Sequence, residues 1–201
     1  MKRRAIAFAA LACTSALQAH HSMSMFDVST PIWVQGTVVR YEHRDPHVIV
    51  TLDQKTADGE VRRLIVEGPN LLRIKRMGVG PDFLKVGDVI QICGFPFKKA
   101  FDESAALRPA IHAHMLVMPD GNRRLFGAYG KLDNCVREGD TADLWVEFLN
   151  TDPLARDAWC KNRNLVTVPS IAPKAVAEEV DRRMAHPCGQ GSASSASSAR
   201  S

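Results

Sequence analysis

The sequence lacks the short motifs that mark several large classes of enzyme. No glycine-rich loop of the nucleotide-binding kind opens a helix, and no Gly-x-Ser-x-Gly elbow surrounds a serine. The serines nearest to histidines are Ser22 and Ser24, and no cysteine pair has the Cys-x-x-Cys spacing of a redox centre or zinc knuckle. No spacing in the chain identifies a general acid, base or nucleophile. We therefore do not expect an enzyme.

The chain also has little net charge once its first residues are set aside. It contains 26 Lys and Arg against 22 Asp and Glu, a formal charge of +4. Lys2, Arg3 and Arg4 precede the short apolar run Ala5–Ala12 and then small residues, the order of a bacterial export signal. That run is too short to span a bilayer, which takes roughly 20 residues. Without those three cations the formal charge is +1, which gives no support to nucleic-acid binding.

The end of this signal decides the mature amino terminus. A cut after Ala19 makes His20 the first residue, and a cut after Ala16, which suits the peptidase's preference for small residues better, leaves three residues ahead of it. A third possibility is that Cys13 is lipidated and becomes the mature amino terminus. We expect residues 1–19 to be removed and the mature protein to be periplasmic or secreted, with no membrane span.

Short β-branched runs separated by turn residues follow to about residue 126. The expected strands are Ile32–Tyr41, Val48–Asp53, Val61–Glu67, Val89–Cys93, Leu107–Met118 and Arg123–Phe126. Gly36 suits a bulge or bend in the first strand, and Asp58-Gly59 indicates a tight hairpin. A short helix is expected at Asn70–Lys75. The pattern predicts a mainly β fold, an antiparallel barrel of the oligonucleotide/oligosaccharide-binding (OB) type, over residues 20–127.

Helical signals dominate the rest of the chain, which makes the protein α+β overall. The expected helices are Ala142–Leu149, Leu154–Lys161 and Lys174–Ala185, two of them opened by proline at the first position. Residues 128–188 therefore form a helical extension that contains cysteines. Residues 189–201 are rich in Gly, Ser and Ala and are expected to form a disordered tail.

Four cysteines remain after export, an even number that suits disulfides in an oxidising compartment. Three pairings are possible. We favour Cys135 with Cys160, which flank a predicted helix, and Cys93 lies in an apolar run where it can equally be a buried thiol.

Histidines are the most suggestive residues for a binding site. His20 and His21 lie at the expected amino terminus, His47 lies in a turn, and His112 and His114 are two residues apart on a strand, so they share one face. Imidazoles combined with an amino-terminal amine favour copper. Asp45 and Glu67 are candidates to orient these imidazoles.

Ordinary roles exist for the same residues. Turn and strand histidines commonly bond to backbone groups or face water, and an Asp before Pro commonly makes a side-chain turn. The runs Arg62-Arg63, Arg73–Arg76 and Arg123-Arg124 can line a ligand groove of a barrel, although such runs are usually solvated.

Several short motifs together resemble a bacterial exported family catalogued as domain of unknown function 6152. They are His20-His21-Ser22, Phe26-Asp27, Gly36-Thr37-Val38, Pro46-His47, Val66-Glu67, Gly78, Gly87-Asp88 and Asp120-Gly121-Asn122-Arg123. The resemblance runs from about His20 to Leu125 and implies an exported β-barrel-like domain with no assigned activity. The chain departs from the family in having Asp45 where the family has Asn, and in lacking aromatic residues near His43, Leu64 and Val79.

Taken together, the sequence predicts an exported binding module of unknown ligand, with copper held by His20, His21, His47, His112 and His114 as the leading hypothesis. The alternative is a metal-free domain that binds a protein or a glycan through its barrel face. The third hypothesis is that the protein is an uncharacterised enzyme.

Overall fold

The computed structural model describes residues 23–98, 110–127, 132–162 and 173–190. The predicted export signal, with His20 and His21, therefore lies outside the described residues, as do residues 191–201 of the predicted tail. Among the described residues, no helix combines the length and the apolar character needed to cross a membrane.

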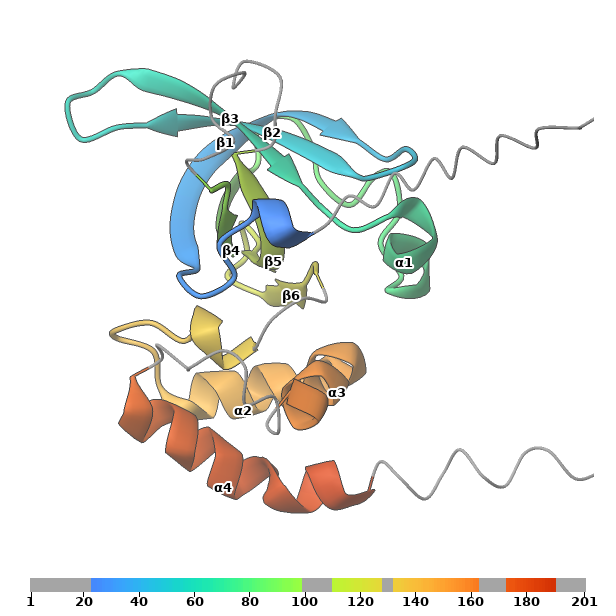
Figure 1. Cartoon of the computed structure of the whole chain (residues 1–201), viewed down its shortest axis with the longest axis vertical. Coiled ribbons are helices and arrows are strands. Elements are labelled where there is room, and N and C mark those ends of the chain that lie inside the picture. The colour runs from blue at the N-terminus through green and yellow to red at the C-terminus, as the bar shows by residue number, and fades with distance from the viewer. Residues whose placement is uncertain (1–22, 99–109, 128–131, 163–172, 191–201) are drawn as a thin grey trace, which may run out of the picture.

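Within the described residues, six strands form one sheet, and five of them close into a barrel (Figure 1). The strands are β1 (Ile32–Glu42), β2 (Ile49–Lys55), β3 (Val61–Glu67), β4 (Val89–Pro96), β5 (Ile111–Val117) and β6 (Arg123–Leu125). β1 pairs antiparallel with β2 and β4, and β2 pairs antiparallel with β3. β5 pairs antiparallel with β4 and parallel with β3, which completes the ring, while β6 extends from β5. The predicted OB-like barrel is confirmed, and the closing pair makes it a mixed sheet.

β1 belongs to both sides of the barrel because it changes partner near its middle. Residues 32–37 pair with β4, and residues 37–42 pair with β2. The register shift falls between Val38 and Arg40, two residues beyond the position expected from Gly36. A Cβ at Gly36 would lie 3.0 Å from the carbonyl oxygen of Asp53, so glycine here permits close approach of the two strands.

Helix α1 (Leu71–Arg76) connects β3 to β4 and matches the predicted short helix. The side chain of Asn70 caps it by accepting a hydrogen bond from the Arg73 amide at 2.9 Å. Gly78 follows with φ of 71°, a left-handed conformation that ends the helix at little cost.

The extension contains the short 3-10 helix η3 (Leu132–Cys135) and the helices α2 (Ala142–Thr151), α3 (Pro153–Asn162) and α4 (Lys174–Gln190). The Asp152 carboxylate accepts hydrogen bonds from the amides of Leu154 and Ala155, both at 3.0 Å, which is the predicted Asp-Pro start of α3. α4 runs two residues into the predicted tail. Figure 1 shows α2, α3 and α4 gathered on one side of the barrel, beyond β6.

Two apolar clusters hold the molecule together. The first fills the barrel interior with side chains from all five ring strands, among them Val38, Leu52 and Ile92. The second lies between the outer face of the barrel and the extension, where Met115 of β5 packs with Trp145 and other residues of the helices. Strand β5 is consequently buried on both faces.

The disulfides differ from the predicted pairing. Cys93 of β4 bonds to Cys135 of η3, and Cys160 of α3 bonds to Cys188 of α4. The prediction of Cys135 with Cys160 was wrong because it considered only the helix between them in the sequence. The fold instead places Cys135 against the outer face of β4, so the first disulfide joins the barrel to the extension.

A buried ion pair provides a second connection. The Arg123 guanidinium lies 2.8 Å from the Asp140 carboxylate, with side chains only 7% and 6% exposed. The indole of Trp145 donates a 2.8 Å hydrogen bond to the same carboxylate. The buried guanidinium therefore has its compensating charge, and Arg123 is a structural residue.

Candidate functional site

Strand β5 places two imidazoles on the outer face of the barrel. Ile111 and Ala113 belong to the apolar cluster inside the barrel, so alternation along the strand directs His112 and His114 outward. Both are covered there, since His112 is 2% exposed and His114 is 0% exposed. Two histidines in a strand buried on both faces are unusual, because buried positions are mostly apolar.

The backbone holds these histidines through a local irregularity. β4 pairs Cys93 with Met115 and Gly94 with Ala113, so His114 is the extra residue of a β-bulge. A Cβ at Gly94 would lie 2.5 Å from the carbonyl oxygen of His112, so the two strands approach this closely only because residue 94 is glycine.

Two histidines converge on one buried carboxylate. Oε1 of Glu67 lies 3.3 Å from Nδ1 of His47 and 3.7 Å from Nδ1 of His112, and Glu67 is 7% exposed. The parallel pairing of β3 with β5 sets Glu67 directly beside His112, and the turn before β2 supplies His47. We call His47, Glu67, His112 and His114 the histidine cluster.

The tautomer of His47 follows from its neighbours. Its Nδ1 also lies 3.1 Å from the carbonyl oxygen of Gly68. A carbonyl and a carboxylate can only accept, so Nδ1 carries the proton and donates. In the neutral ring the lone pair is then on Nε2, the atom through which a histidine oriented in this way binds a metal.

His114 is the most deeply buried member of the cluster. Its ring lies 5.5 Å from that of Phe95, and neither ring nitrogen has a hydrogen-bond partner among the described residues. Burial, followed by the charges of His112 and Arg73, lowers the pKa of His114 to about 3. The ring is therefore neutral at physiological pH and keeps a lone pair that can bind a metal.

The amino-terminal segment packs against the histidine cluster. Phe26 forms an isolated β-bridge with Phe97, and its ring lies 5.4 Å from that of His112. The short helix η1 (Met23–Met25) immediately precedes it. The described chain thus begins beside the cluster, and His21 precedes Phe26 by five residues in the sequence.

The remaining predicted residues lie elsewhere. Asp45 is exposed, and the carboxylate beside His47 is that of Glu67. Nε2 of His43 lies 3.2 Å from the carbonyl oxygen of Val79, an ordinary backbone contact. Within the described residues, no group of three or more His, Cys, Asp or Glu side chains is arranged to hold a metal ion. The described part of the cluster is therefore incomplete as a metal site.

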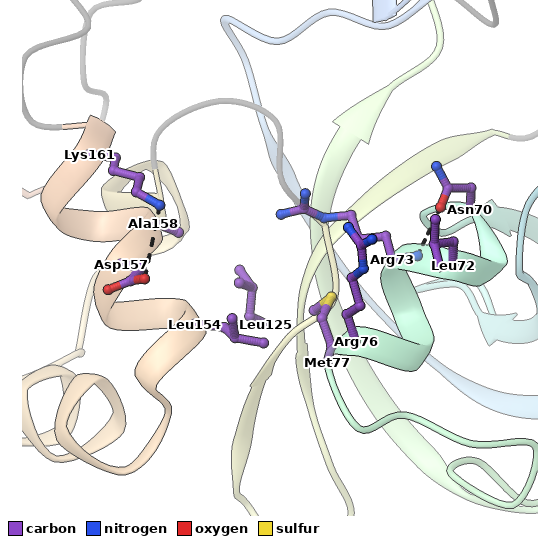
Figure 2. A pocket seen from close by; sticks show the side chains of 10 residues that line it. All are labelled: Asn70, Leu72, Arg73, Arg76, Met77, Leu125, Leu154, Asp157, Ala158 and Lys161. Carbon is purple, nitrogen blue, oxygen red and sulfur yellow. Dashed lines mark hydrogen bonds and ion pairs between the residues drawn. The ribbon is translucent and has the colours of Figure 1, made fainter. Parts of the chain in front are cut away.

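A cavity of about 540 Å³ lies between α1 and α3 (Figure 2). Arg73 and Arg76 line it from the barrel, whereas Lys161 lines it from the extension. The sequence indicated the arginines as possible groove residues but not their partner on α3, because only the packing of the extension brings the two helices together. Of the other cationic runs, Arg63 is paired with Asp53.

The architecture defines the class of protein, a small closed β-barrel of the OB type linked by a disulfide to a helical extension. A family model for DUF6152, a family of unknown function, matches residues 8–105 of the chain. The match confirms the resemblance found in the sequence. It ends before β5, so Asp120–Arg123 and the histidines of β5 lie outside it. A comparison with curated proteins finds no match.

Proposed function

We propose that the protein is an exported binding module that holds one copper ion at the histidine cluster, completed by His20 and His21. Signal cleavage after Ala19 would give His20 a free α-amine next to its imidazole, a chelating pair that Cu(II) favours. The proposal assigns His47, His112 and His114 as the further ligands, and these side chains need His20 and His21 because no three described side chains form a metal site by themselves. Glu67 serves as the carboxylate that orients His47.

The observation that carries the proposal is the orientation of His47. Metal-binding histidines almost always donate their other ring N–H to a carboxylate or a backbone carbonyl, which fixes the tautomer. Nδ1 of His47 has one acceptor of each kind, Gly68 O at 3.1 Å and Glu67 Oε1 at 3.3 Å. This arrangement leaves the lone pair on Nε2.

The second support is the position of the amino terminus. Phe26 contacts His112, and the intervening chain between His21 and Phe26 is only four residues long. His21 is five Cα-to-Cα steps from Phe26 and His20 is six, which span at most about 18 and 22 Å when fully extended, so covalent geometry permits both histidines to reach the cluster. Two disulfides are compatible with the oxidising compartment that export would provide.

The test uses mature protein purified from the periplasm, with its first residue established by intact mass. We expect about one copper per chain, and we expect His20→Ala, or one residue added ahead of His20, to weaken copper affinity at least tenfold. Glu67→Gln, which keeps the shape of the side chain, should weaken it by about 10- to 100-fold.

His186→Ala is the matched control, because His186 is an exposed histidine on α4 away from the cluster residues in sequence. Copper affinity should be unchanged in this variant. Equal copper affinity in wild-type protein and His20→Ala would overturn the proposal. A mature protein that binds no copper would instead favour the metal-free interaction domain.

A further inference from the structure

The cavity between α1 and α3 has charged groups on both of its walls. Arg73 and Arg76 are three residues apart on α1, so they share one face of the helix. Figure 2 shows both side chains extending from α1 toward the cavity, with Lys161 on the facing helix. Among the described residues that line the cavity, Asp157 is the one carboxylate against these three cations.

The two arginines are not neutralised within the described structure. Neither Arg73 nor Arg76 forms an ion pair with another described residue, in contrast to Arg63 and Arg123. Lys161 lies 3.9 Å from Asp157, and both side chains are more than half exposed. Water screens an exposed pair of this kind, so the pair hardly opposes binding of another anion.

The cavity also has apolar walls. Leu72 of α1 is 60% exposed and Leu154 of α3 is 42% exposed, and both are among the large apolar side chains that the described surface leaves uncovered. Met77 and Leu125 also line the cavity. Exposed apolar side chains on facing walls indicate an apolar occupant.

A second cavity continues this surface. It has a volume of about 340 Å³ and shares Met77, Leu125 and Leu154 with the first. Phe83, the cationic Arg124 and the anionic Asp152 also line it. The combined space falls in the range of small-molecule sites, about 300–1,000 Å³, and is concave, unlike a surface that rests on a membrane.

We propose that this cleft binds a small amphiphilic anion, a molecule with one carboxylate or phosphate head and an unbranched apolar body. Arginine matches both anions because its planar guanidinium donates two parallel hydrogen bonds. The head lies between Arg73, Arg76 and Lys161, and the body covers the exposed side chains of Leu72 and Leu154. The site shares no residue with the histidine cluster and does not depend on copper.

The test measures binding of decanoate and decanol to the mature, disulfide-bonded chain by titration calorimetry. The two probes have the same apolar body and differ in the charge of the head. We expect decanoate to bind at least tenfold more tightly than decanol. In the variant with Arg73→Gln and Arg76→Gln, decanoate affinity should fall at least tenfold while decanol affinity stays unchanged.

The matched control is Arg62→Gln, an exposed arginine of β3 outside the cleft, which should leave decanoate affinity unchanged. Thermal unfolding of each variant shows that the fold is retained. Three results would overturn the proposal: equal decanoate affinity in wild-type protein and the double variant, equal affinity for decanoate and decanol, or binding to anionic lipid vesicles without binding of free decanoate.

Discussion

The disulfide between Cys93 and Cys135 should contribute strongly to stability, because it closes a long loop and links the barrel to the extension. The two residues are 42 positions apart, compared with 28 for Cys160 and Cys188. The loop-entropy relation gives about 4 kcal/mol for the first disulfide and about 3.6 kcal/mol for the second.

The perturbation is the double substitution Cys93→Ala and Cys135→Ala, since both residues are fully buried and alanine adds no polar group. A loss of about 4 kcal/mol lowers the unfolding temperature of a chain of this size by roughly 8–16 °C. Calorimetry of the oxidised protein provides the measurement. Cys160→Ala with Cys188→Ala is the matched comparison, with a slightly smaller decrease expected.

Peptide mapping tests the pairing itself. Trypsin separates the four cysteines into the peptides 86–98, 132–137, 157–161 and 184–200. Without reduction, mass spectrometry should find 86–98 linked to 132–137 and 157–161 linked to 184–200. A link between 132–137 and 157–161 would refute the reasoning, as would an unchanged unfolding temperature in the Cys93 and Cys135 variant.

Two further predictions concern ionisable groups that the fold buries. Asp140→Ala should lower the free energy of unfolding by about 3–5 kcal/mol in urea denaturation, because it leaves Arg123 buried without its partner, whereas the exposed control Asp82→Ala should have almost no effect. An equally small loss in both variants would contradict the role of the ion pair. Burial raises the pKa of Tyr41, which donates to Gly80 O at 3.2 Å, to about 12. The unfolded phenol ionises near pH 10 while the folded one keeps its proton, so stability should fall between about pH 10 and 12. Tyr41→Phe should remove that part of the pH dependence, and identical profiles would disprove it.

The order of the strands and helices could be predicted from local patterns. β-Branched runs, the Asp58-Gly59 hairpin and the Asn70 cap each act over a few residues, and the sequence contains all the information that such features need. Even the number of short strands pointed to a barrel, because a small antiparallel sheet without closure would leave exposed edges.

The exact ends of the elements, the position of the bulge and the pairing of the cysteines could not be predicted from local sequence patterns. The bulge in β1 lies between Val38 and Arg40 rather than at Gly36, and α4 continues to Gln190 although the composition changes at residue 189. The cysteine pairing depends on which surfaces come together when the extension packs on the barrel. Such contacts join residues far apart in the chain.

The histidine cluster illustrates the same division. By itself the sequence determined that His112 and His114 share a strand face, since that follows from the two-residue period of any strand. Only the tertiary structure decided that Glu67, rather than Asp45, lies beside His47, because the antiparallel pairing of β2 with β3 sets Glu67 opposite Ile49, two residues after His47. In the same way, the arginines of α1 were visible in the sequence, but Lys161 and Leu154 became their neighbours only through packing of the extension. Local chemistry determined the elements, and long-range packing determined which side chains meet.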